Sequence, residues 1–254
     1  MVVAGNCLYV ESENTKLLID AGVSLKKIET GLETLNVSPS SLDGILVTHE
    51  HSDHIQSLGN LSKKFNLPVY ANSETFDAMP KQTDKISAEN INKFKVTEKF
   101  QIKDIEVNPF SIPHDAVNPC GFSISNNSEK LSIATDIGHM TNDILKQLED
   151  SKFILLESNY DTEVLKCSKY PYLLKQRIAG PNGHLSNEVA SKVINYLLQG
   201  NLKTAMLGHL SKESNFPELA YQTVVDEIIR AGTDVSKLNL SVASRDKVGN
   251  LIHI

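Results

Sequence analysis

The chain has 254 residues, of which 40% are hydrophobic, and its net charge is −6. This length is enough to bury a sizeable core, and we expect a single domain over residues 1–254. The negative charge excludes a protein coated in basic surface, so any contact with nucleic acid has to be local. Three widely spaced cysteines without a CxxC pair argue against a disulfide framework or a thiolate zinc site. Because no signal peptide and no membrane-length apolar run is present, we expect a cytoplasmic protein with no membrane partner.

Strands and helices alternate along the first half of the chain. Short apolar runs predict strands over residues 7–10, 16–20, 44–48 and 68–71, and helical spacing predicts helices over 24–35, 55–65 and 73–78. Alternating apolar residues over 94–107 predict a hairpin that turns at Lys103 and Asp104.

The second half repeats this order. Strands are expected over residues 120–125 and 131–135, joined by a turn at 126–129, then over 153–157 and 204–208. Helices are expected over 141–148, 186–198 and 216–231, and a last strand pair over 238–242 and 247–252. Two strand-rich halves, each followed by helices, predict an α/β fold of two packed mixed sheets with helices on the outer faces, an αββα four-layer sandwich.

The run Thr48-His49-Glu50-His51-Ser52-Asp53-His54 is the strongest sign of chemistry in the chain. It joins the strand at 44–48 to a helix, and its alternation points His49 and His51 toward one metal ion and Asp53 and His54 toward a second. Imidazole suits zinc, iron and manganese, and a carboxylate holds the second cation. The alternative is a set of surface histidines, but this order rarely arises by chance. Metal-dependent hydrolysis is the leading hypothesis.

Three later polar residues each follow an apolar strand and are further ligand candidates. His114 follows residues 110–113, Asp136 follows 131–135, and His209 follows 204–208. Ligands from several strand ends can converge at one edge of a sheet. Taken singly, His114 is equally explained as a loop histidine, Asp136 as a helix N-cap and His209 as part of a polar turn.

Seven segments carry a resemblance to a known family. The chain resembles the metallo-β-lactamase-fold hydrolases and is most similar to their YycJ (WalJ) branch, whose members are regarded as exonuclease-like DNA-processing enzymes. The matching segments are Leu-Ile-Asp-Ala-Gly at 18–22, His-x-His-x-Asp-His at 49–54, His-Asp-Ala at 114–116, Thr-Asp-Ile-Gly at 135–138, Glu-Ser-Asn at 157–159, Gly-His-Leu-Ser-Asn at 183–187 and His-Leu-Ser-Lys-Glu at 209–213. The last three point to the branch.

The resemblance implies a site with two divalent metal ions, which are zinc, manganese or iron. It assigns His49, His51 and His114 to the first ion and Asp53, His54 and His209 to the second. It also makes Asp136 the bridge between them, counts Asp53 among the catalytic residues, and gives Asp20 the task of orienting a ligand without binding metal. Such a site produces a hydroxide nucleophile near neutral pH and suits phosphoesters.

Glu157 and His184 resemble the proton-donating pair of related phosphodiesterases of this fold, in which the carboxylate orients the imidazole and raises its basicity. The alternative is that Glu157 only caps or forms a salt bridge and that His184 simply precedes the helix that starts near Ser186.

Basic and aromatic residues interleave between 160 and 177 and give the only local hint of a substrate. A single strand of nucleic acid could be contacted there by Lys169, Tyr170, Tyr172, Lys175 and Arg177, and a phosphate by Ser211 and Lys212. The alternative is a solvated helix face with core tyrosines.

Two positions depart from the branch pattern. Relatives open with a strand and a Ser/Gly-rich segment before the Gly5-Asn6-Cys7 element, so the first strand is expected to be shortened or missing. Tyr160 stands where relatives commonly carry histidine.

Three functions remain open. The first is a metal-dependent phosphodiesterase or exonuclease that acts on DNA or RNA ends. The second is a small-molecule phosphodiesterase or other ester hydrolase that uses the same site, and the third is a non-catalytic regulatory protein that keeps the fold.

Overall fold

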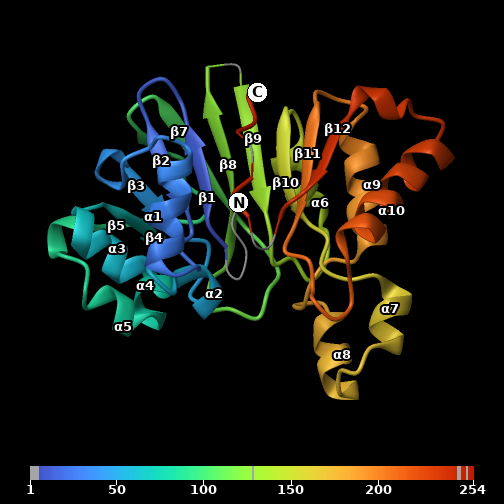
Figure 1. Ribbon diagram of the computed structural model, residues 1–254, viewed down its shortest axis with the longest axis horizontal. Helices are drawn as coiled ribbons and strands as arrows, with labels where there is room; N and C mark the ends of the chain where they lie inside the picture. The colour runs from blue at the N-terminus through green and yellow to red at the C-terminus, as the bar shows by residue number, and fades with distance from the viewer. Residues whose placement is uncertain (1–5, 128, 245–246, 250) are drawn as a thin grey trace. The chain divides into compact units, whose positions relative to one another are not determined.

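The computed structural model describes residues 6–127, 129–244, 247–249 and 251–254. The chain forms two compact units, each described below by itself. Unit 1 contains the residues up to 109 together with 116–120 and 243–253, and unit 2 contains 110–115, 121–242 and residue 254. Figure 1 shows the elements of both, coloured along the chain.

Unit 1 contains a mixed sheet with the strand order β1-β2-β3-β4-β5. β1 and β2 are antiparallel, and β2, β3, β4 and β5 run parallel to one another. An antiparallel hairpin of two further strands follows, with its turn at Lys103 and Asp104 as predicted. The strands are β1 (Leu8–Glu11), β2 (Lys16–Ile19), β3 (Gly44–Leu46), β4 (Val69–Asn72), β5 (Ile91–Phe94), β6 (Phe100–Ile102) and β7 (Ile105–Ser111), of which the last two residues belong to unit 2.

The helices of unit 1 pack apolar faces on this five-stranded sheet. In α1, the Ser24 side chain accepts a hydrogen bond from the Lys27 N–H and caps the helix, and Ile28 and Leu32 are buried one turn apart. They join a core with sheet residues such as Ile45 and Val69. The helices are α1 (Leu25–Thr34), η1 (Pro39–Ser41), α2 (Ser52–Ile55), α3 (Leu58–Phe65), α4 (Ser73–Ala78), α5 (Pro80–Thr83) and η2 (Ala88–Asn90).

In unit 2, strands follow the order β12-β11-β10-β9-β8. β8 and β9 are antiparallel, whereas β9, β10, β11 and β12 are parallel, so their carboxyl ends lie at one edge. The strands are β8 (Cys120–Asn126), β9 (Glu129–Ala134), β10 (Phe153–Glu157), β11 (Thr204–Gly208) and β12 (Asn239–Val242). β10 and β11 are buried along their whole length, as their mainly apolar sequences predict.

The core of unit 2 lies between these strands and three of its helices. Val193 and Ile194 of α9 and Val224 of α10 meet Leu156 of β10 in one buried cluster, to which α6 adds Ile144. Figure 1 shows α9 and α10 together beside the strands, whereas α7 and α8 lie apart from them, beyond the strand ends. The helices are α6 (Asn142–Leu148), α7 (Thr162–Cys167), α8 (Tyr172–Ile178), α9 (Asn187–Leu197), α10 (Pro217–Arg230) and η3 (Val235–Lys237).

The α/β class with mixed sheets and helices is confirmed, and most predicted elements lie within two residues of their expected bounds. The strand expected over 247–252 is wrong, since residues 247–249 and 251–252 form none. Leu251 is 50% exposed, so this segment has no buried face to hold a strand. The helix expected over 55–65 is interrupted between α2 and α3, and β5, α5, α7 and α8 were not among the predicted elements. The first strand was expected to be shortened or missing, and residues 1–5, where it would lie, are outside the described residues. Ser128, which belongs to the turn expected at 126–129, is also outside them.

Candidate active site

In unit 1, the histidine-rich loop lies between β3 and α2, as predicted. His51 is the N-cap residue of α2, which places Asp53 and His54 in its single turn. The His49 ring lies with its centroid 4.6 Å from that of His51 and 4.0 Å from that of His54. His49 and His54 are fully buried, whereas the Asp53 side chain is about half exposed. The loop therefore gathers three imidazoles and leaves its carboxylate accessible.

Asp20 fixes this loop from the end of β2. Its two carboxylate oxygens accept hydrogen bonds from the Thr48 N–H and hydroxyl, both at 2.9 Å, and Oδ2 lies 2.7 Å from His54 Nδ1. The Asp20 backbone has φ 61°, a left-handed conformation that aspartate adopts more readily than most residues. Because His54 donates Nδ1–H to Asp20, its lone pair is on Nε2.

Asn6 contacts this loop, although none of the sequence motifs assigned it a role. Its side-chain Nδ2 lies 2.7 Å from His54 Nε2, and its backbone N–H donates to the Asp53 carbonyl at 2.6 Å. The residue is 7% exposed. The Gly5-Asn6-Cys7 element was the only sequence feature that drew attention to this residue. Its contact with His54 could not be predicted, because the two residues are 48 positions apart in sequence.

In unit 2, four predicted residues come together after the strands. Asp136, Glu157, His184 and His209 each offer a ligand atom, and these atoms lie within 4.8 Å of one another. Asp136 Oδ1 is 3.5 Å from His209 Nδ1 and 3.8 Å from His184 Nδ1, and it is 3.6 Å from Nε2 of His114. Asp136 and His209 have φ 60° and 55°. Both residues thus have a left-handed backbone conformation, which non-glycine residues adopt infrequently.

Glu157, the last residue of β10, organises this cluster. Its side chain is fully buried, and its Oε1 accepts hydrogen bonds from His184 Nδ1 at 2.9 Å and from His209 Nδ1 at 2.7 Å. Its Oε2 accepts from the backbone N–H groups of Ile137 and Leu185, at 2.7 and 3.0 Å. The contact with His184 agrees with the predicted pair, and the contact with His209 was not predicted.

Charge and hydrogen bonding set the protonation states of this pair. Burial raises the pKa of Glu157, but the charge of His184 and the hydrogen bonds from both histidines outweigh burial and hold that pKa below its usual range. Burial lowers the pKa of His184, but the charge of Glu157 and the hydrogen bond to it reverse the direction and raise it. The geometry therefore favours a carboxylate that faces a protonated imidazole.

His114 is held by a backbone carbonyl. Its Nδ1 donates to the carbonyl of Gly183 at 3.1 Å, and burial lowers its pKa below the usual histidine value. The residue that supplies this carbonyl directly precedes His184, whose own N–H donates to the Ile178 carbonyl at 2.8 Å. With Nδ1–H donated to this carbonyl, the lone pair of a neutral His114 imidazole lies on Nε2.

The hydrogen bonds made by the histidines fit metal ligands. The Nδ1 atoms of His54, His114 and His209 face Asp20, the Gly183 carbonyl and Glu157, and His49 Nδ1 lies 3.0 Å from the Thr48 hydroxyl. Ligating histidines in proteins use one ring nitrogen for the metal and hold the other in such a hydrogen bond. With carboxylates of Asp53 and Asp136 nearby in their own units, the donor set suits borderline divalent cations.

The residues expected to contact substrate lie around α8 and after β11. Tyr172 is exposed and is not part of a core. The Tyr170 hydroxyl lies 3.5 Å from the Ser211 hydroxyl. The Arg177 side chain pairs with Asp115. Lys169 and Lys212 are exposed, and Lys175 Nζ donates to a backbone carbonyl of α7 at 2.6 Å. Tyr160 is only 9% exposed and forms a β-bridge with Ser186, so its position has a structural explanation.

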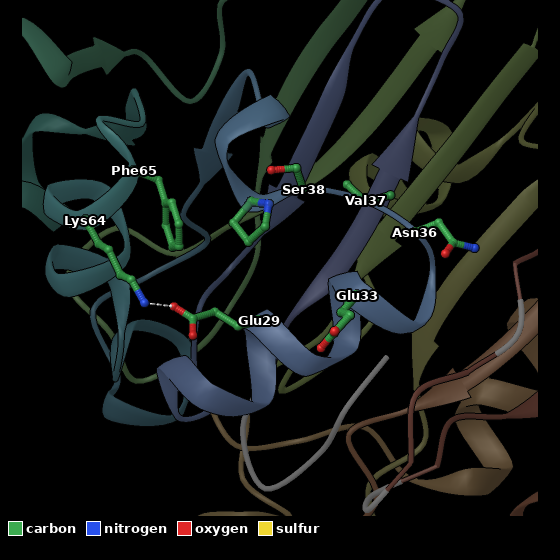
Figure 2. Close-up of a pocket in the computed structure, with 8 residues that line it drawn as sticks. Glu29, Glu33, Asn36, Val37, Ser38, Lys64 and Phe65 are labelled. Carbon is green, nitrogen blue, oxygen red and sulfur yellow. Dashed lines mark hydrogen bonds and ion pairs between the residues drawn. The ribbon is translucent and has the colours of Figure 1, made fainter.

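A surface hollow of about 510 Å³ in unit 1 lies elsewhere (Figure 2). It is lined by α1, the segment after it and the end of α3, and an ion pair between Lys64 and Glu29 crosses it. None of the described residues that line this hollow belongs to the predicted site.

Comparison with known proteins decides the family. The family model described as the β-lactamase superfamily domain matches residues 15–209. The chain is 38% identical over 234 residues to exodeoxyribonuclease WalJ of Streptococcus pneumoniae serotype 2, a match that covers 91% of this chain and 87% of that protein. The chain belongs to the WalJ/YycJ branch of the β-lactamase superfamily. It is also 37% identical over 233 residues to exodeoxyribonuclease YycJ of Bacillus anthracis, with 92% and 88% covered.

Solved structures place this branch member in the same fold. The metallo-β-lactamase fold protein YhfI from Bacillus subtilis matches with a TM-score of 0.68 at 17% identity, covering 96% of this chain and 90% of that one. The short form of human tRNase Z matches with a TM-score of 0.65 at 15% identity, covering 98% and 93%. The predicted metallo-β-lactamase fold is confirmed, and membership implies divalent metal ions.

Proposed function

We propose that this protein is a metal-dependent exodeoxyribonuclease that hydrolyses phosphodiester bonds at DNA ends. Metal-dependent hydrolysis follows from the family, and the names of the two curated relatives favour DNA over a small-molecule ester. In the described part of the chain no helix has the length and apolarity that a bilayer crossing requires. Three free cysteines agree with a reducing cytoplasm as the place of action.

The observation that carries this proposal is the Glu157–His184 pair beside Asp136 in unit 2. Hydrolysis of an unactivated phosphodiester needs a proton for the departing oxygen, and an imidazole oriented by a buried carboxylate is suited to supply it. His184 is the more accessible partner, since its side chain is 23% exposed against none for Glu157. We assign His184 as the proton donor to the leaving oxygen and Glu157 as the group that orients it.

We assign the metal ligands as the motif order suggests. His49, His51 and His114 would hold one divalent ion, Asp53, His54 and His209 a second, and Asp136 both. When bound, such ions supply an activated water at neutral pH and neutralise charge on the phosphoryl oxygens. Asp20 and Glu157 hold Nδ1 of His54 and His209, so Nε2 is the nitrogen that would face a metal, and on His54 a metal would replace the contact with Asn6 Nδ2.

The test of this function compares the wild type with a ligand variant on end-labelled DNA. The metal-loaded wild type is expected to release nucleotides from an end, whereas Asp53→Ala is expected to lose both bound metal and activity. Wild-type protein that holds metal and hydrolyses bis(p-nitrophenyl) phosphate but leaves DNA intact would reject the nuclease and favour the small-molecule hydrolase.

A further inference from the structure

The helix α8 of unit 2 exposes apolar side chains that no described part of its own unit covers. None of its seven residues is buried, and Tyr172 and Leu173 are 72% and 77% exposed, the largest values among large hydrophobic residues in the described chain. Exposed apolar side chains that gather in one patch can mark a contact surface, whereas single ones are common on protein surfaces. We name residues 169–178 the α8 arm.

The ring of Tyr172 is held in place on this arm. Gln176, one turn later, donates a hydrogen bond from Nε2 to the Tyr172 hydroxyl at 2.9 Å. Pro171 precedes the helix and fixes the backbone before the ring. An aromatic side chain that is already ordered loses little conformational entropy when a planar ligand stacks on it.

The charge around the arm is opposite to that of the whole chain. From Val164 to Asn187 the sequence has four cationic side chains, Lys166, Lys169, Lys175 and Arg177, and no carboxylate, although the net charge of the protein is −6. Two of these cations are paired, because Lys166 faces Glu163 and Arg177 faces Asp115. Lys169 is exposed at the start of the arm. An aromatic surface flanked by cations suits a polyanion with planar groups.

Hydrogen bonds tie the arm to the loops that carry the proposed site. The Ile178 carbonyl, at the end of α8, accepts the N–H of His184 at 2.8 Å. Arg177 Nε donates to Asp115 at 2.7 Å, directly after His114, and the Tyr170 hydroxyl lies 3.5 Å from that of Ser211, two residues after His209. The arm thus has a fixed place relative to the histidines of unit 2.

Close packing also restrains the loop between the arm and His184. A Cβ on Gly183 would lie 2.2 Å from the carbonyl oxygens of Arg177 and Ile178, and one on Gly138 would lie 2.1 Å from that of Pro181. The loop 179–183 is therefore closely packed against both the arm and the segment that carries Asp136. A ligand bound to the arm would thus have a defined position within this unit.

We propose that the α8 arm binds the unpaired end of a DNA strand, with Tyr172 stacked on a base, Leu173 packed beside it and Lys169 near a phosphate. This inference rests on the proposed nuclease function and adds single-stranded character to its substrate. A second copy of the chain is a poorer occupant, since a stable interface buries about 800 Å² on each partner and the only helix of the arm, α8, has seven residues.

The test measures binding apart from cleavage. Metal-loaded protein is titrated into a fluorescent single-stranded oligonucleotide with hydrolysis-resistant phosphorothioate linkages, and binding is followed by anisotropy. Tyr172→Ala is expected to weaken binding by about 5- to 150-fold, because one base–aromatic stack is worth about 1–3 kcal/mol. Tyr172→Phe keeps the ring but loses the hydrogen bond from Gln176, so it should retain most of the binding that Tyr172→Ala loses. Tyr196→Ala, which removes a 50% exposed tyrosine from α9, is the matched control and should also bind like the wild type.

Two further readouts separate this inference from the nuclease itself. Hydrolysis of bis(p-nitrophenyl) phosphate by Tyr172→Ala should fall far less than oligonucleotide binding, because that small substrate has no strand that could extend onto the arm. Equal affinity of Tyr172→Ala and wild type for the oligonucleotide, or no binding by the wild type, would overturn the inference. A loss of dimer in Tyr172→Ala by light scattering would overturn it in favour of a second copy. Wild type that binds DNA through Tyr172 without cleaving it would reject the nuclease and leave the arm in place.

Discussion

Glu157 Oε1 lies 2.9 Å from Nδ1 of His184 and serves a second histidine with the same oxygen, since Nδ1 of His209 is 2.7 Å away. One buried carboxylate at the end of β10 thus orients a proposed proton donor and a proposed metal ligand together. Removal of the His184 imidazole should therefore affect proton donation, whereas removal of the His209 imidazole should affect metal binding.

Replacement of His184 by alanine should remove turnover and keep metal. We expect kcat on DNA to fall about 10²- to 10⁴-fold, the range for loss of a general acid, with metal content unchanged. The loss should be much smaller for bis(p-nitrophenyl) phosphate, whose leaving group departs without a proton. A loss of bound metal in His184→Ala, measured by elemental analysis, or an equal loss of rate on both substrates would contradict the assignment.

Replacement of Glu157 by alanine should reduce stability as well as activity. It removes the acceptor of two imidazoles and two backbone N–H groups from a fully buried position. We expect the free energy of unfolding to fall by about 3–5 kcal/mol, as when one partner of a buried ion pair is removed. Glu149→Ala, which removes the acceptor of the exposed Tyr196 hydroxyl, serves as the control and should stay within about 1 kcal/mol of the wild type in urea unfolding.

Replacement of Gly22 by alanine tests how tightly the metal loop is held. A Cβ at this position would lie 1.6 Å from the carbonyl oxygen of Asp53, so the loop has to move. We expect weaker metal binding in competition with a chelator and a loss of about 1–3 kcal/mol of stability. Gly200→Ala is the matched control, because its Cβ meets nothing closer than 3.5 Å among the described residues. Wild-type metal affinity in Gly22→Ala would show that the loop tolerates displacement.

Acid should weaken a contact between two turns of unit 1. Asp104 accepts hydrogen bonds from Thr15 and Ser12, and these hold its pKa below the usual range despite some desolvation. A lowered folded-state pKa means that the stabilisation is complete above the unfolded pKa, about 3.9, and is lost as pH falls through the folded pKa. The difference in unfolding free energy between wild type and Asp104→Asn should thus be constant near neutrality and shrink below about pH 4. A difference that grows on acidification would contradict this linkage.

The sequence predicted those strands and helices whose formation depends on neighbouring residues in the chain. Residues 153–156 and 205–207 are apolar runs, and the expected strands over 153–157 and 204–208 form β10 and β11 with the expected bounds. The helix expected over 141–148 is confirmed as α6, whose start is fixed by the Thr141 side chain, which accepts a hydrogen bond from the Ile144 N–H. The break between α2 and α3 had no local signal, because Ser57 is held by the Ala21 and Val23 carbonyls of a distant segment.

The same distinction applies to the site. The order His-x-His-x-Asp-His and the strand-end positions of Asp136 and His209 were readable because each depends on a short stretch of chain. The contacts of Asn6 with His54 and of Glu157 with His209 were not, since they join residues 48 and 52 positions apart. Exposure of Tyr172 likewise needed the structure, because the sequence fits a core tyrosine equally well.

Metal content measured together with DNA digestion tests the central claim most directly. The wild type is expected to bind about two divalent ions per chain and to release nucleotides from end-labelled DNA, with activity lost on chelation and restored by metal. Asp53→Ala should bind less metal and leave the DNA intact. Wild-type digestion by Asp53→Ala, or digestion that persists in metal-free protein, would contradict a metal-dependent nuclease.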